Sequence, residues 1–200
     1  EGAFDAIFHL ASITDTTEQD QYRQVHDKVE GFRKLLQWAK SDQTPLVYAS
    51  SAAVYGKTET VMGERCTPSP QNAYAFSKIQ LDHLSGYYRK QYPAWNLVGL
   101  RYFNVYGPHE DHKTNMSSPV LSFVNQIKKN RQIKLFGSTK NVNFKKFTRD
   151  FVHVDDICNI NYMFYSSKKK FNGIYDVGSG VSTSFYKIAI ILKKWYKQNK

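Results

Sequence analysis

Pro45-Leu46-Val47-Tyr48-Ala49-Ser50-Ser51 is the stretch that decides the fold, because here an apolar run of strand length ends in two serines. Such a run is typical of a strand buried on both faces, with polar groups at its carboxyl end. Residues 4–11 and 96–102 are further short apolar runs, and apolar residues recur near helical spacing over 18–40 and 72–90. Strands that alternate with helices in this way predict βαβ units and therefore an α/β fold with a parallel sheet.

The sequence changes character after Gly107-Pro108, where basic and polar segments interrupt the regular alternation. We expect, in order, a helix, a strand, a long loop, a strand, a helix, a strand and a final helix, at residues 119–129, 133–136, 138–148, 151–154, 156–166, 174–177 and 184–200. The run at 4–11 is predicted to be a fully buried strand, which needs a neighbour on both sides. The final helix is still running at residue 200. We therefore expect these residues to form the interior of a longer chain.

Composition places the chain among globular proteins. Its 200 residues are 41% hydrophobic, 15% aromatic and 22% charged, which excludes a disordered or fibrous chain. No apolar stretch approaches the ~20 residues of a membrane helix, so we expect no membrane partner. The 28 basic and 17 acidic side chains give a net charge of +11, which suits anionic partners, although scattered lysines are also typical of a solvated surface. Cys66 and Cys158 lack Cys-x-x-Cys spacing and fit a reducing compartment without disulfides or zinc.

One tyrosine and one lysine carry the candidate chemistry. Tyr74 and Lys78 are four residues apart, which places both side chains on one face of the predicted helix. Tyr165 and Tyr196 also precede a lysine by four residues, so the spacing alone does not identify a site. Only Tyr74 follows a strand that ends in Ser51 and precedes a strand that ends in a Gly-Pro loop. Ligands of open parallel sheets bind beyond such carboxyl ends, so we expect an active site there.

This trio of residues fits an acid/base that works on an alcohol. A phenol has a pKa of about 10 and is a poor base at neutral pH. A lysine ammonium beside Tyr74, together with a cationic nicotinamide, favours the phenolate. The Ser51 hydroxyl can hold the substrate oxygen while Tyr74 takes the alcohol proton and hydride leaves the carbon. We therefore predict Tyr74 as the acid/base, supported by Lys78 and Ser51.

Ser51, Tyr74 and Lys78 in this order resemble the signature of the short-chain dehydrogenase/reductase superfamily. Two strings, Tyr-Ala-Ser-Ser-Ala-Ala-Val-Tyr-Gly at 48–56 and Leu-Arg-Tyr-Phe-Asn-Val-Tyr-Gly-Pro at 100–108, resemble its extended, nucleotide-sugar-modifying branch. Within that branch, residues 104–118 resemble the Asn-Val-Tyr-Gly-Pro…His-Lys-x-x-Met-x-Ser stretch of the ADP-L-glycero-D-manno-heptose 6-epimerase family. Further similar strings lie at 134–138, 149–156 and 173–180, and the resemblance spans about residues 5–192.

The resemblance implies a Rossmann-type parallel sheet, here its later strands only, and a smaller substrate-binding domain. It implies that residues 1–107 belong to the NADP-binding Rossmann domain and 108–200 mainly to the substrate-binding domain, with about 148–165 returning to the former. The catalytic residues would be Ser51, Tyr74, Lys78 and, as a second acid/base on the opposite sugar face, Lys113. The cofactor contacts would be Leu10, Ala11, Ser12, Ile13, Thr14, Asp27, Lys78, Val105 and Lys113. The substrate contacts would be Ser51, Asn104, Asn115, Ser122, Phe136, Gly137, Ser138 and Arg149.

The implied reaction is epimerisation at C6 of ADP-D-glycero-D-manno-heptose to the L-glycero form, through a transient 6-keto intermediate. The resemblance implies bound NADP, with NAD as the alternative, and no metal. It also implies an ADP-sugar as partner, a homo-oligomer, a cytoplasmic location and a role in lipopolysaccharide core precursor synthesis. The sequence departs from the family in several respects, two of which concern the cofactor. The Gly-rich phosphate loop is absent, and the asparagine expected near the start of the first helix is Asp27 or Lys28.

Two alternative functions stay open. The first is another nucleotide-sugar epimerase or dehydratase of the same superfamily. A dehydratase is disfavoured because the region after Ser51 reads Ala-Ala-Val-Tyr-Gly, without the Asp-Glu pair that such enzymes often carry. The second is a non-catalytic, basic nucleic-acid-binding module, for which the sequence contains no binding motif, so we expect no nucleic-acid partner. The run His109-Glu-Asp-His112 is not a metal site by our interpretation, because four consecutive ligands cannot all point at one ion.

Overall fold

The computed structural model describes residues 4–15, 20–57, 66–113, 116–135, 137 and 143–199. The chain divides into two compact units, one made of Glu1–Tyr102 and Cys158–Val177 and the other of Phe103–Ile157 and Gly178–Lys200. The first unit therefore ends a few residues earlier than the predicted boundary at 107. The segment that returns to it is 158–177, whereas the sequence predicted about 148–165.

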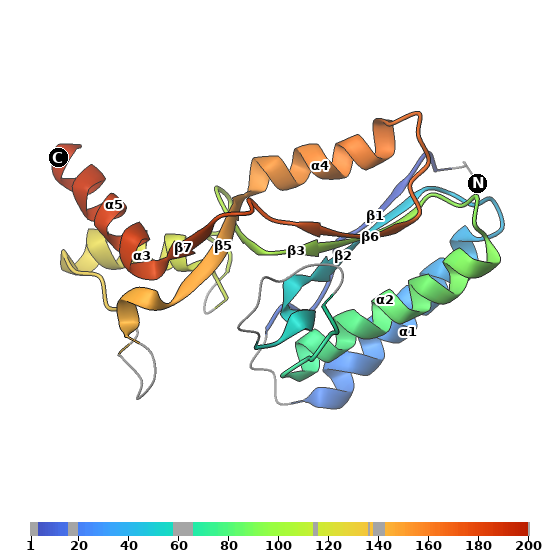
Figure 1. The fold of residues 1–200 in the computed structure, drawn as a ribbon, viewed down its shortest axis with the longest axis horizontal. Helices are drawn as coiled ribbons and strands as arrows, with labels where there is room; N and C mark the ends of the chain where they lie inside the picture. The colour runs from blue at the N-terminus through green and yellow to red at the C-terminus, as the bar shows by residue number, and fades with distance from the viewer. Residues whose placement is uncertain are drawn as a thin grey trace. The chain divides into compact units, whose positions relative to one another are not determined.

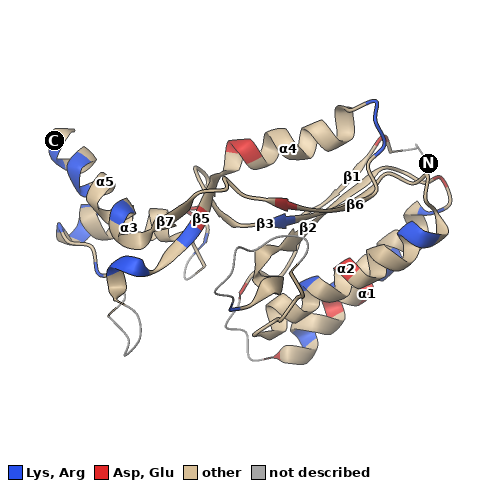
Figure 2. Cartoon of the chain, viewed as in Figure 1, with Lys and Arg blue, Asp and Glu red and all other residues tan. Residues whose placement is uncertain are grey.

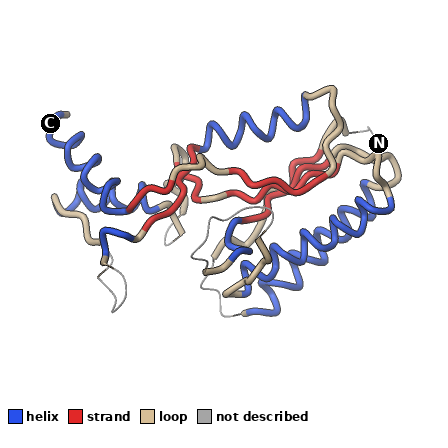
Figure 3. The backbone as a smooth tube through the Cα atoms, in the orientation of Figure 1, coloured by secondary structure: helices blue, strands red, loops and turns tan. Residues whose placement is uncertain are grey.

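The first unit is built on a four-stranded parallel sheet, so the predicted α/β class is confirmed (Figure 1). The strand order is β1-β2-β3-β6, with bounds Ile7–His9, Leu46–Ser51, Leu97–Tyr102 and Gly173–Val177. Helices α1 (Gln21–Ala39) and α2 (Ala73–Gln91) cover one face of this sheet, and α4 (Val154–Ser166) runs along the other face (Figures 1 and 3). The parallel arrangement brings the carboxyl ends of β1, β2 and β3 to one edge, which is where the candidate residues lie.

Both helices on the first face begin at polar caps. The Asp20 side chain accepts a hydrogen bond from the Arg23 backbone N–H at 2.8 Å, and the Asn72 side chain accepts one from Ala75 at 2.8 Å. Each cap satisfies a backbone donor that the first helical turn leaves unpaired. The cap at Asn72 determines where α2 begins and therefore the position of Tyr74 in its first turn.

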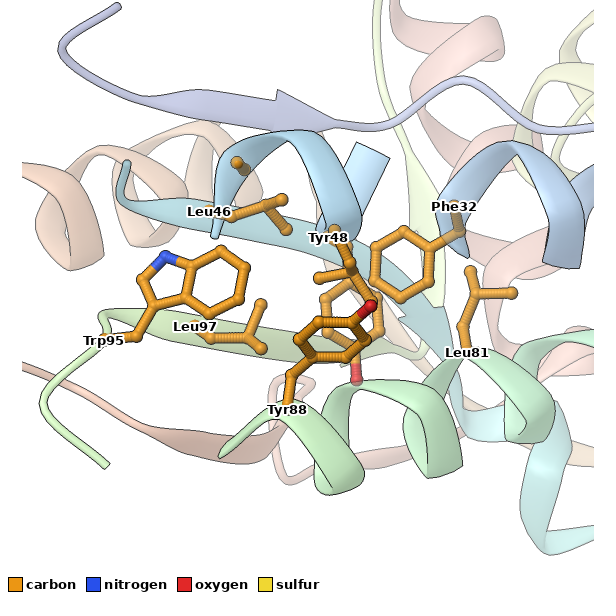
Figure 4. Packing of buried hydrophobic residues seen from close by; sticks show 9 residues of the cluster. Phe32, Leu46, Tyr48, Leu81, Tyr88, Trp95 and Leu97 are labelled. Carbon is orange, nitrogen blue, oxygen red and sulfur yellow. The ribbon is translucent and has the colours of Figure 1, made fainter. Parts of the chain in front are cut away.

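The core of the first unit lies between the sheet and the two helices on its first face. It consists of Phe32, Leu36, Ala39, Leu46, Tyr48, Leu81, Tyr88, Trp95 and Leu97, most of which Figure 4 labels. Phe32 from α1 and Tyr48 from β2 are fully buried, and their ring centroids are 4.8 Å apart. Burying a side chain of this size stabilises the fold by roughly 1.5–3 kcal/mol. This packing holds α1 and α2 at fixed positions on the sheet.

A buried polar network ties the sheet to α2. The Tyr48 hydroxyl donates to Asp82 Oδ1 at 3.0 Å, and Arg101 Nε donates to Asp82 Oδ2 at 3.0 Å. Arg101 also donates to the Tyr55 hydroxyl at 2.8 Å, which in turn donates to Asp176 at 2.7 Å. Buried charges are tolerated when hydrogen bonds satisfy them in this way. The network therefore joins β2, β3 and β6 to α2 at Asp82, one helical turn after Lys78.

The second unit contains a three-stranded sheet in the order β4-β5-β7, with bounds Asn104–Tyr106, Thr148–His153 and Ser182–Ser184. Its helices are α3 (Pro119–Asn130) and α5 (Phe185–Gln198), with a short 3-10 turn η2 (Phe144–Lys146). Phe123 and Phe185 form the centre of its core. Lysines recur along η2 and α5 (Figure 2). Among the described residues, no helix has the length and apolar character needed to cross a membrane.

Two predicted elements differ in the structure. The strand expected at 133–136 is irregular chain over 133–135, where Ile133 and Leu135 pack against the Phe123 cluster, and residue 136 lies outside the described residues. The strand expected at 4–11 is only Ile7–His9 and, among the described strands, pairs with β2 alone. Phe8 in this strand is 41% exposed, and the expected neighbour on the other side of β1 is not among the described strands.

Candidate active site

The first turns of α2 bring Tyr74 and Lys78 onto the carboxyl end of β2. Lys78 is only 3% exposed, and its Nζ donates a hydrogen bond to the Ala49 carbonyl of β2 at 2.7 Å. The same nitrogen lies 5.7 Å from the centroid of the Tyr74 ring. The i, i+4 spacing thus places a buried ammonium beside the phenol, as predicted.

Ser51 completes this group at the last residue of β2. Its Oγ accepts a hydrogen bond from the Ala53 backbone N–H at 3.2 Å, at the start of the 3-10 turn η1 (Ala52–Tyr55). The Ser51 hydroxyl also lies near enough to Tyr74 to lower the pKa of the phenol. The structure therefore brings Ser51, Tyr74 and Lys78 together.

Burial opposes ionisation of both titratable groups in this cluster. Burial raises the pKa of Tyr74, and the nearby Ser51 hydroxyl partly offsets that rise. Burial also lowers the pKa of Lys78 to about 8, against the opposing charge of Asp82. At neutral pH Tyr74 therefore carries its proton and Lys78 is mostly an ammonium, whose charge favours the phenolate when the proton leaves.

Lys28 of α1 is a member of this cluster that the sequence analysis did not select. Its Nζ lies 4.6 Å from the centroid of the Tyr74 ring and donates to Ser77 Oγ at 3.3 Å. Asp27, which was predicted to contact the cofactor, is exposed and contacts His26 at 3.3 Å. Residue 28, and not residue 27, is therefore on the buried face of α1. The only signal in the sequence was that one of these two residues replaces an expected asparagine.

The loop after β1 contains a buried hydroxyl without a partner. Among the five residues predicted to contact a cofactor, Leu10, Ala11 and Thr14 are exposed, whereas Ser12 and Ile13 are half-buried. Ser12 Oγ is buried and has no hydrogen-bond partner among the described residues. Leaving such a group unpaired costs about 1–3 kcal/mol, so its position favours a polar ligand group at this strand end. Together with Lys78, the Ser12 loop fits a nicotinamide cofactor, although the Gly-rich phosphate motif does not occur in residues 1–200.

The second unit holds the remaining predicted contacts. Asn104 Nδ2 donates to the Asp150 carbonyl at 3.1 Å, and Val105 lies opposite Val152 in the β4–β5 pair. Ser122 accepts a hydrogen bond from Gln126 at 3.2 Å, and Arg149 is exposed. A side chain at Gly137 would meet no described atom within 4 Å. Three further predicted contacts lie outside the described residues: Asn115, Phe136 and Ser138.

Glu110 organises the turn that carries Lys113. Its carboxylate accepts hydrogen bonds from the Ser118 backbone N–H at 2.7 Å, from Ser118 Oγ at 2.7 Å and from the Gly107 N–H at 3.2 Å. Burial alone would raise the pKa of Glu110, but the hydrogen bonds from Ser118 and Gly107 outweigh it and hold that pKa below its usual range. Lys113 Nζ lies 3.9 Å from Glu110 Oε2, and its side chain is 42% exposed. Within the described part of the chain, no group of three or more His, Cys, Asp or Glu residues could hold a metal ion.

Known proteins match this chain both in sequence and in fold. The model of the NAD dependent epimerase/dehydratase family matches residues 1–178. The chain is 38% identical over 195 residues to an ADP-L-glycero-D-manno-heptose-6-epimerase of Brachyspira hyodysenteriae, covering 96% of this chain and 59% of that protein. It is thus about three fifths as long as this relative.

Solved structures agree with the sequence matches. The Helicobacter pylori ADP-L-glycero-D-manno-heptose-6-epimerase superposes with a TM-score of 0.83 at 35% identity, over 96% of this chain and 58% of that one. The Thermus thermophilus UDP-glucose 4-epimerase, solved with NAD, superposes with a TM-score of 0.80 at 25% identity, over 95% and 61%. The family match covers most of the chain, and the Ser51, Tyr74 and Lys78 group lies at the expected strand end. The chain therefore belongs to the NAD dependent epimerase/dehydratase family.

Proposed function

We propose that this chain carries the catalytic residues of an ADP-heptose 6-epimerase, which inverts C6 of ADP-D-glycero-D-manno-heptose through a transient 6-keto intermediate. The observation that carries the proposal is the cluster of Ser51, Tyr74 and Lys78 at the carboxyl end of β2. The choice of an ADP-heptose rests on the 38% identity to a relative of that name.

Tyr74 is the acid/base for the first half of the reaction. Its phenolate takes the proton of the C6 hydroxyl as C6 loses hydride, and the second acid/base supplies the proton when the hydroxyl is restored on the other face. The Ser51 hydroxyl, which lies near Tyr74 at the end of β2, holds the reacting oxygen. Lys78 stabilises the phenolate, and its fixed bond to the Ala49 carbonyl keeps the ammonium in place.

A bound nicotinamide cofactor supplies the acceptor and donor of the hydride. We propose NADP, with NAD as the alternative, held on this chain by Lys78 and by the strand end that contains Ser12. The substrate intermediate presents its other face before hydride returns, so the cofactor is regenerated in each turnover.

Lys113 is proposed as the second acid/base, on the opposite face of the sugar. A second group is needed because the C6 oxygen occupies different places in the two half-reactions. Glu110 holds the turn around Lys113 by three hydrogen bonds, which restricts where the ammonium can reach. The nucleotide and sugar contacts are proposed to include Asn104, Asn115, Ser122, Phe136, Gly137, Ser138 and Arg149. A homo-oligomer in the cytoplasm that supplies lipopolysaccharide core precursors completes the proposal.

The second candidate function is another nucleotide-sugar epimerase. The fold match to a UDP-glucose 4-epimerase at 25% identity favours it over unrelated activities. Proton NMR of the sugar, recorded while the full-length gene product acts on a panel of ADP- and UDP-sugars, separates the two. We expect interconversion of the two C6 epimers of ADP-manno-heptose and no change in UDP-glucose. Inversion of UDP-glucose at C4, with the ADP-heptose unchanged, would refute the proposal in favour of the alternative.

A further inference from the structure

Two lysines, and not one, lie against the Tyr74 ring. Lys28 Nζ is 4.6 Å from the ring centroid, nearer than Lys78 Nζ at 5.7 Å. Lys28 comes from the buried face of α1 and is only 9% exposed. Burying an ammonium costs free energy unless the group is hydrogen-bonded and its charge is paired with an electron-rich group. The groups around Lys28 therefore show what its charge does.

The hydrogen-bond partners of Lys28 are neutral. Its Nζ donates to the side-chain oxygen of Gln24 and, at 3.3 Å, to Ser77 Oγ. Within the described part of the chain, no ion pair joins Lys28 to a carboxylate. The aromatic face of Tyr74 is therefore the electron-rich group that its charge meets. A cation over an aromatic face is attracted to the ring, and the attraction grows when the ring carries the negative charge of a phenolate.

We propose that Lys28 is a positioning residue for proton transfer, whose ammonium over the Tyr74 ring stabilises the phenolate that forms during turnover. The inference rests on the proposed role of Tyr74 as acid/base.

The charge of Lys28 depends on pH, and the sign of the effect follows from its surroundings. Burial, and then the charge of Lys78, lower the pKa of Lys28 to about 8. The other ionisable groups around Lys28 and Tyr74 are Lys78 and Asp82 on α2 and His9 at the end of β1. Burial and the charge of Lys78 lower the pKa of His9, so it is neutral at neutral pH. Lys28 is thus a cation below pH 8 and loses its charge above it.

Replacing Lys28 by a neutral residue should produce a loss of activity that depends on pH. In Lys28→Met and Lys28→Gln we expect kcat at neutral pH to fall by about tenfold or more, the effect of moving the phenol pKa by about one unit. The KM for the nucleotide sugar should change little, because Lys28 acts through Tyr74. The deficit should shrink above pH 8, where the wild-type lysine is itself neutral. A Lys28→Arg protein, which keeps a cation, should retain most of the activity at neutral pH.

A matched control is available on the same helix. Lys34 is exposed, so Lys34→Met removes a charge from α1 without touching the cluster, and its pH profile should follow the wild type. The Gln variant keeps hydrogen-bonding capacity at position 28 and covers the case in which the Met variant unfolds. A loss of kcat that is the same at every pH, and that Lys28→Arg shares, would show a purely structural role and overturn the proposal.

A second readout does not depend on the reaction catalysed. The full-length gene product labelled with 3-fluorotyrosine is titrated by fluorine NMR, and the resonance of residue 74 is identified by its loss in Tyr74→Phe. We expect this resonance to respond to pH around 8 more strongly in the wild type than in Lys28→Met or Lys28→Gln. Identical titration curves would refute the inference, even if the protein epimerises an ADP-heptose. Absence of that activity with the expected difference in titration would refute the proposed function and leave the inference standing.

Discussion

Gly99→Ala should destabilise the first unit, because β3 has no side chain where the Tyr48 ring lies. Gly99 pairs with Tyr48 in the β2–β3 register, and a Cβ at residue 99 would be 2.3 Å from the Tyr48 hydroxyl and 2.5 Å from Cζ. The ring cannot move aside without cost. Its hydroxyl is bonded to Asp82 at 3.0 Å and to Ser85 at 2.7 Å, and it is fully buried.

The magnitude follows from two penalties and one gain. Overpacking a buried site costs typically 1–3 kcal/mol. Displacing the Tyr48 hydroxyl weakens two hydrogen bonds that are worth about 1 kcal/mol each. Restricting the unfolded chain by replacing glycine offsets about 0.4–1 kcal/mol of this loss. We therefore expect Gly99→Ala to lower the free energy of unfolding by about 2–4 kcal/mol.

Gly31→Ala is the matched control, because the same substitution should have the opposite sign. Gly31 is exposed within α1, and a Cβ there meets no described atom within 4 Å. Alanine in a helix interior is favoured over glycine by about 0.8–1 kcal/mol. Urea unfolding of both variants, followed by circular dichroism and by tryptophan fluorescence, measures the two changes. A Gly99→Ala protein as stable as the wild type would refute the close packing of Tyr48 on β3.

Two further predictions concern the turn of the second unit. Lys113→Met should lower kcat by roughly 10²-fold or more while nucleotide affinity, measured by calorimetry, stays nearly unchanged; a rise in KM with kcat intact would make Lys113 a binding contact only. Glu110→Gln should flatten the acid side of the stability curve. Because the folded-state pKa of Glu110 is lowered, its contribution is complete above the ordinary glutamate pKa of about 4.3 and is lost as the pH falls through the lowered value. The free energy of unfolding of both proteins is measured from pH 7 to acid pH. A difference between Glu110→Gln and wild type that stays constant over this range would contradict the assignment.

Most of the first unit could be predicted because its signals are local. The Asn72 cap and the four-residue spacing of Tyr74 and Lys78 lie within one helix, whose geometry puts both side chains on one face. The apolar run that ends at Ser51 likewise contains its own evidence for a buried strand with a polar end. The structure placed all three residues together as expected.

The missed features depend on contacts between distant segments. Lys28 reaches Ser77 across 49 residues of sequence, and nothing in the local pattern of α1 distinguishes it from a surface lysine. The strand β7 reads Ser-Thr-Ser and forms only by antiparallel pairing with β5, so it carries no apolar signal. Ile133 and Leu135 alternate like a strand but pack as irregular chain against the Phe123 cluster. An alternation of apolar and polar residues indicates only that one side of the segment is buried, and an irregular segment packed on a core can have the same pattern.

Turnover of the Tyr74→Phe protein tests the central claim most directly. The removed atom is the phenolic oxygen that is proposed to carry the proton, whereas the ring that packs beneath Lys28 is kept. With the full-length gene product and ADP-D-glycero-D-manno-heptose, we predict that kcat falls by roughly 10²–10⁴-fold while the unfolding temperature stays close to that of the wild type. A turnover within a few-fold of the wild type would contradict the account, because the proton would then have to pass through another residue.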